Sequence, residues 1–170
     1  MTVLMTAADD SPSPPRFSPA INAILAAAPS MPLDAGTVDA ALVQRLRSLD
    51  LAAIGHGLAA KACLAGMWLL ANDLGSSHRL SQELHTPEGS FWHAIMHRRE
   101  GDFGNAKYWF RRVGRHPVLE SLAVDPFRFV DEVEHCVLRR DGNEAALVAI
   151  QQLEWETLFR FCWDLARSTI

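Results

Sequence analysis

Helix start and stop signals in residues 86–117 constrain the fold more than any other feature of the chain. Thr86 is a favoured N-cap residue, and Pro87 fits the first position of a helix. Gly101 is a typical helix stop, and Asp102 behind it can cap a new helix at once. The segment therefore predicts two helices joined by a tight turn, which is a helical hairpin.

The rest of the chain also has helical spacing of its apolar residues, and no stretch alternates with the period of two that strands show. The expected helices cover residues 37–49, 54–72, 78–84, 87–100, 103–113, 125–140 and 144–167. Their short connections predict antiparallel hairpins, so we expect an all-α fold. In the last helix the residues expected to face the core are Leu147, Ile150, Leu153, Leu158, Phe161 and Leu165.

The N-terminal part differs in composition from the rest. Six of the nine prolines come before Leu33, and the stretch DDSPSPPRFSP has no apolar periodicity. Such a stretch predicts disorder or loose packing, although residues 21–28 can form a short helix. A length of 170 residues suits one domain. We therefore expect a flexible tail over residues 1–32 and one helical domain over residues 33–170.

The hairpin resembles part of a tetratricopeptide (TPR) repeat. Ala94 matches the small residue of the repeat's first helix, and residues 101–103 match its turn. Ala106 and Phe110 match the A-x-x-x-F pattern of its second helix. The departures from the repeat are Ser90, His93, His97 and Pro117. The resemblance implies a TPR-like pair of helices and, as one function, a non-catalytic module that binds a peptide or protein.

A second resemblance covers residues 64–117. The phrase WHAIMHRREGDFGNAKYWFRRVGRHP, with NDLGSSHRLSQ upstream, is similar to the core of a family of uncharacterised bacterial and fungal proteins. That family carries no established activity. The resemblance therefore implies a family and no function.

The histidines of this segment predict a metal site. His93 and His97 are four residues apart, so they share one face of their helix, and Glu100 continues the stripe. Two imidazoles one turn apart commonly hold a divalent transition metal. His78 on the preceding helix is the third expected ligand, and His93, His97 and Glu100 are the candidate catalytic residues. Asp73 and Gln82 are expected to support the site. A metal-free polar pocket and a purely structural network remain open alternatives.

Basic and aromatic residues surround these histidines. Residues 91–117 hold six Lys or Arg residues against two acidic ones. Arg98 and Arg112 suit recognition of a small anionic molecule, because a guanidinium pairs with carboxylate or phosphate oxygens. Trp109 and Asn105 are expected to line the same cleft. The alternative for the arginines is salt bridging to Glu132, Glu134, Glu154 or Glu156.

Other classes of function are disfavoured. A net charge of -4 and the lack of a nucleic-acid-binding module make a nucleic-acid partner unlikely. The chain has no Gly-rich phosphate loop, no GxSxG elbow and no calcium loop. Its most apolar run, residues 62–71, is too short to span a bilayer. Three widely spaced cysteines and no secretory signal predict a cytoplasmic protein with free thiols.

Overall fold

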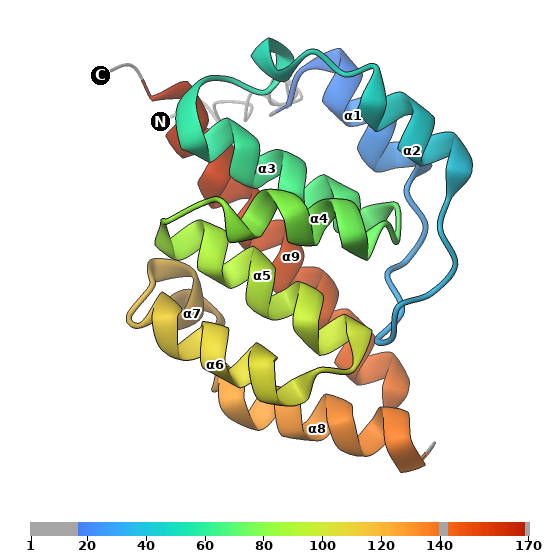
Figure 1. The fold of residues 1–170 in the computed structure, drawn as a ribbon, viewed down its shortest axis with the longest axis vertical. Helices are drawn as coiled ribbons and strands as arrows, with labels where there is room; N and C mark the ends of the chain where they lie inside the picture. Colours follow the sequence, from blue (N-terminus) through green and yellow to red (C-terminus); the bar gives the residue numbers. More distant parts are fainter. Residues whose placement is uncertain (1–16, 140–142, 169–170) are drawn as a thin grey trace, which may run out of the picture.

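The computed structural model describes residues 17–139 and 143–168, and within these ranges the chain is helical with no strand. Figure 1 shows the helices packed as one domain, which confirms the all-α prediction. The elements are α1 (Pro19–Ala27), α2 (Ala40–Arg47), a short 3-10 turn (Leu51–Ala53), α3 (Gly57–Leu70), α4 (Leu74–Gln82), α5 (Pro87–Glu100), α6 (Phe103–Val113), α7 (Pro117–Leu122), α8 (Pro126–Arg139) and α9 (Glu144–Arg167).

The predicted hairpin forms α5 and α6, with the predicted caps. The Thr86 hydroxyl accepts a hydrogen bond from the Gly89 backbone N–H at 3.1 Å. Gly101 ends α5 with φ of 88°, a left-handed conformation that favours glycine. Asp102 then accepts a hydrogen bond from the Asn105 backbone N–H at 3.0 Å and starts α6. The two helices consequently lie antiparallel and side by side (Figure 1).

α5 is the central helix of the domain. It contacts α3, α4, α6 and α8, and every residue from Gly89 to Arg99 is buried. This stretch includes four basic side chains: His93, His97, Arg98 and Arg99. Because water cannot solvate them fully, each needs a partner inside the protein or a ligand.

The segment preceding residue 33 contributes to the core. α1 buries Ile21 and Ile24, Met31 is also buried, and the Phe17 ring packs edge-on against Trp163 on α9 with ring centroids 5.1 Å apart. Residues 17–32, which we expected in a flexible tail, therefore pack with the domain. Of the prolines before Leu33 in the described residues, Pro19 occupies the first turn of α1, and Pro29 and Pro32 follow the helix, so none interrupts it. The expected tail preceding residue 17 lies outside the described residues.

α7 is an element that the sequence analysis did not predict. Pro117 was expected to end the preceding helix, but it opens α7 at the first helical position. The backbone N–H of Val118 donates to Nδ1 of His116, which acts as the cap at 3.2 Å. Histidine is not a usual cap residue, so this start has no strong sequence signal.

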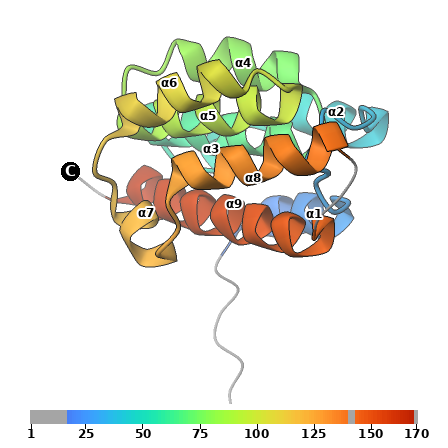
Figure 2. The same cartoon turned by 90° about the horizontal axis from the view of Figure 1, so that it is seen from below.

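The predicted core face of α9 is confirmed in part, because Leu147 and Leu158 are buried. Leu153 and Leu165 are 54% and 47% exposed, whereas Trp155 and Phe159 are buried. The Trp155 indole donates to the Gly66 carbonyl of α3 at 2.8 Å, which fixes the rotation of the helix. Two polar residues on this inner face, Gln151 and Glu154, are buried as well. Figure 2 shows α9 along one side of the domain, beneath the layer that contains α5.

Two further predictions concern the cysteines and the length of the apolar helices. All three cysteines are free and buried. Within residues 17–139 and 143–168, no helix combines the length and the apolar character needed to cross a membrane.

Candidate metal centre

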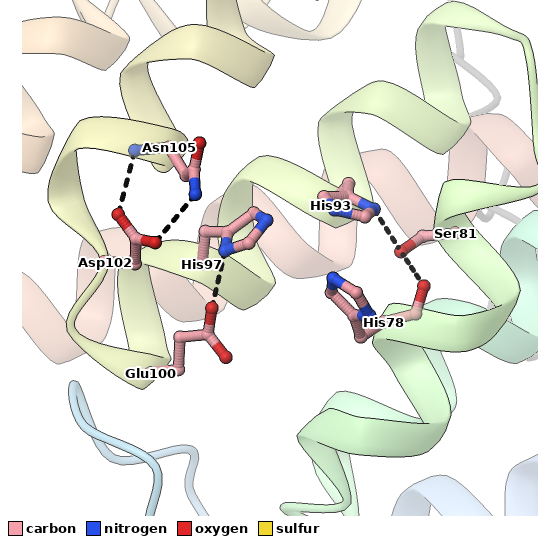
Figure 3. A network of polar contacts seen from close by, with 7 residues as sticks. All are labelled: His78, Ser81, His93, His97, Glu100, Asp102 and Asn105. Atoms are coloured by element: carbon pink, nitrogen blue, oxygen red, sulfur yellow. Dashed lines mark hydrogen bonds and ion pairs between the residues drawn. The ribbon is translucent and has the colours of Figure 1, made fainter.

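Three histidines meet where α4 packs against α5 (Figure 3). His78 comes from α4, and His93 and His97 come from successive turns of α5. Each ring offers a nitrogen, and these three nitrogens all lie within 4.8 Å of one another. His93 and His97 are buried and His78 is half-buried. The structure thus brings together the three residues that we predicted as metal ligands.

The arrangement follows from where α4 begins. The Asp73 carboxylate accepts a hydrogen bond from the Ser76 backbone N–H at 2.9 Å and starts α4 at Leu74. The Ser77 hydroxyl donates to the Ala65 carbonyl at 2.9 Å and holds α4 on α3. His78, the next residue, then lies over α5, with its ring centroid 4.7 Å from that of His93.

Ser81 lies within hydrogen-bond distance of His93. The Ser81 hydroxyl can donate its proton to the His78 carbonyl at 3.3 Å, and it lies 3.0 Å from Nδ1 of His93. When the proton is on the carbonyl, the hydroxyl oxygen accepts from His93 Nδ1–H. In that tautomer Nε2 of His93 carries the lone pair that a metal ion needs. Sequence analysis missed Ser81, although it is three residues after His78 and so shares its face of α4.

Glu100 sets the tautomer of His97. Nδ1 of His97 lies 2.5 Å from the Glu100 carboxylate, which accepts a proton and never donates one when ionised. Nε2 of His97 is therefore left unprotonated. Glu100 sits at the opposite end of the ring from Nε2, so it orients His97 and does not itself complete the histidine group. Hydrogen bonds of this kind commonly orient metal-ligating histidines.

A second group of potential ligands, made of His97, Glu100 and Asp102, lies beside the first. Both carboxylates are already used. Glu100 accepts from His97, and Asp102 accepts from the backbone and the side-chain amide of Asn105 at 3.0 and 2.7 Å. In this second group Asp102 therefore acts as a helix cap, and Glu100 acts as the partner of His97.

The electrostatics of the group keep His93 neutral. Burial, together with the neighbouring charges of His97 and His78, lowers the pKa of His93 from its ordinary value of 6.5 to about 3. A neutral imidazole is the form that binds a metal. At neutral pH the most buried ring therefore has a lone pair available.

Trp109 and Arg112 of α6 continue the site outward. The Trp109 ring lies over His93 with centroids 4.1 Å apart, and the Arg112 guanidinium carbon is 5.2 Å from the Trp109 centroid. Trp109 is half-buried and Arg112 is exposed. Trp109 thus packs against His93, and Arg112 packs against Trp109.

The other predicted ligand-binding residues lie elsewhere or have structural partners. Arg98 points toward α9, where it pairs with Glu154 at 2.5 Å. Asn105 binds Asp102, as described above. Asp73 caps α4 through Ser76, and Gln82 is exposed at the end of α4.

Comparisons of the chain with family models, curated proteins and solved structures find no match. The class of the protein is therefore stated from its own structure: it is an all-α domain whose central helix carries a buried group of histidines.

Proposed function

We propose that His78, His93 and His97 bind a divalent transition metal ion. One observation carries the proposal: three imidazole nitrogens converge within 4.8 Å, and no hydrogen bond from the described residues reaches the Nε2 atoms of His93 and His97 or the ring of His78. Imidazole nitrogens that converge at this spacing can share one divalent ion through their lone pairs.

The surroundings of the rings support the same proposal. Nδ1 of His93 and Nδ1 of His97 each lie within hydrogen-bond distance of an oxygen, from Ser81 and Glu100 respectively. This arrangement holds the rings in place and makes Nε2 a better ligand. Imidazole suits zinc, copper, nickel and cobalt, and three histidines leave one tetrahedral position open.

An open position suits an enzyme. Three neutral histidines leave the ion's charge of +2 undiminished, and a zinc ion in such a site lowers the pKa of a bound water to about 7. Hydrolysis of a small substrate is the reaction class that this favours. Glu100 then acts as a positioning residue through His97, and the three histidines are the residues closest to the chemistry.

A TPR-like interaction module has less support. In a TPR array the paired helices line an open groove, but α5 is buried from Gly89 to Arg99 and has helices on several sides. The α5–α6 hairpin therefore does not present its first helix to a peptide. The histidines that depart from the repeat pattern are also the ones that converge.

Metal analysis of protein purified without an affinity tag tests the proposal. We expect one equivalent of a transition metal, either as purified or after cobalt(II) titration of chelator-treated protein. His78→Ala should abolish binding while the helical circular dichroism stays unchanged, because His78 is only half-buried. His85→Ala is the matched control, since His85 is an exposed histidine in the α4–α5 connection. Folded wild-type protein that binds no metal at micromolar concentrations would overturn the proposal.

A further inference from the structure

Arg112 is a cation that the protein positions without neutralising it. Its guanidinium carbon lies 5.2 Å from the Trp109 ring centroid and 6.0 Å from that of Tyr108. Aromatic faces attract a guanidinium and restrict its motion. Within the described ranges, no carboxylate and no hydrogen-bond acceptor contacts Arg112. Its five N–H donors are therefore held in place and free.

The same indole ring connects Arg112 to the histidines. Trp109 lies 4.1 Å from the His93 ring, centroid to centroid. The Trp109 centroid is 4.1 Å from the His93 centroid and 5.2 Å from the Arg112 guanidinium carbon. The distance from that carbon to the His93 centroid is therefore at most 9.3 Å. A molecule of a few carbon atoms can span this distance.

The two buried arginines of the segment, Arg98 and Arg99, differ from the exposed Arg112. Arg98 is neutralised by Glu154. Arg99 donates to the Leu69 carbonyl at 2.6 Å and to the Asn72 side-chain oxygen at 2.6 Å. Their donors are used inside the protein, so Arg112 is the arginine beside the histidines that remains available to a ligand.

We propose that the site binds a short dicarboxylate or a similar small dianion, with one acidic group in the open metal position and the other on Arg112. The inference rests on the proposed metal site. Three neutral ligands bring no negative charge to the ion, and Glu100 is engaged at the far end of His97. Arg112 adds a further positive charge with a geometry suited to two parallel hydrogen bonds. Two separated positive centres match a ligand with two separated negative groups.

Succinate and butyrate test this directly, because both have four carbons and only succinate has a second carboxylate. Cobalt(II)-loaded protein reports the binding of either through its visible absorption. We expect succinate to bind at least about tenfold more tightly than butyrate, as one charged hydrogen-bonded contact allows. In Arg112→Gln that advantage should disappear, while butyrate affinity stays unchanged. Arg111→Gln is the matched control, because Arg111 is an exposed neighbour without the aromatic contacts.

The outcomes separate the two proposals. If cobalt does not bind, the metal site itself is wrong and the dianion inference falls with it. If cobalt binds but succinate and butyrate have equal affinities, only the dianion inference fails. An equal loss in Arg111→Gln and Arg112→Gln would also overturn it, because it would indicate general electrostatic attraction.

Discussion

α5 has two polar sides, and they differ in whether their buried polar groups have partners within the chain. On one side, Arg98 and Arg99 find partners within the chain. On the other side, His93 and His97 each have one ring nitrogen bonded and the other unpaired. Both pairs lie on the same helix and are almost fully buried. The difference indicates that the arginine side stabilises the fold, whereas the histidine side is arranged for a ligand.

The arginine side connects distant parts of the chain. Arg98 joins α5 to α9 through Glu154 and also lies 4.5 Å over the Phe129 ring of α8. Arg99 donates to backbone carbonyls at Asp34 and Leu69, and so holds the segment before α2 against α3 and α5. Burial, together with the charge of Arg98, lowers the pKa of Arg99 to about 10, which still leaves it protonated at neutral pH.

The largest effect should come from breaking the arginine side. Glu154→Ala leaves the Arg98 charge buried without its carboxylate, and we expect a loss of about 3–5 kcal/mol in the free energy of unfolding. Urea denaturation followed by circular dichroism measures it. Glu156→Ala, two residues further on the same helix, removes a half-exposed pair with Arg160 and a hydrogen bond from the Gln152 amide, and should cost only about 1 kcal/mol. Equal losses in the two variants would contradict a structural role for the Arg98–Glu154 pair.

The histidine side should respond to metal instead. If the site binds zinc, a free concentration of a hundred times the dissociation constant should stabilise the wild-type protein by about 2.7 kcal/mol. The gain arises because the ion binds the folded chain and bridges α4 to α5. Thermal unfolding with and without zinc measures the shift. His78→Ala should lose the shift, and His85→Ala should keep it. A shift that survives in His78→Ala would place the zinc elsewhere.

These two sides also differed in how far the sequence could predict them. The histidine group depends on spacing within α5 and on the Asp73 and Thr86 caps, all of which are local signals. The hairpin boundaries were predictable for the same reason. Metal binding itself stays a prediction.

The arginine side depends on contacts that no local pattern encodes. Arg98 meets Glu154 across 56 residues. Sequence analysis placed Leu153 on the inner face of α9 because leucines outline a plausible stripe. The Arg98 charge and the Trp155 hydrogen bond to α3 decide the rotation of α9 instead. Such tertiary contacts override a helical pattern that has apolar residues on several sides.

A smaller effect should come from the groups that orient the ligands. Glu100→Ala removes the acceptor for His97 Nδ1–H and should weaken metal binding about 10–100-fold. Glu100→Gln retains an acceptor oxygen and should weaken it less. Competition with a chelator of known affinity measures the dissociation constants. Glu83→Ala, an exposed carboxylate at the end of α4, serves as the control. If Glu83→Ala weakens binding as much as Glu100→Ala, the role assigned to Glu100 is wrong.

The smallest effect concerns acid and applies to metal-free protein. The folded pKa of His93 is about 3, below the ordinary value of 6.5, so the unfolded chain takes up a proton that the folded chain refuses. The free energy of unfolding should therefore fall as the pH drops below about 6.5, and the loss should continue toward pH 3. Between pH 6.5 and 4.5 few carboxylates titrate, and there the melting temperature of His93→Gln should fall less steeply than that of the wild type. No comparable contribution is expected from Arg99, whose pKa of about 10 keeps it charged throughout this range. Parallel curves for the two proteins would show that His93 is protonated in the folded state, and the contrast between the two sides of α5 would then lose its electrostatic basis.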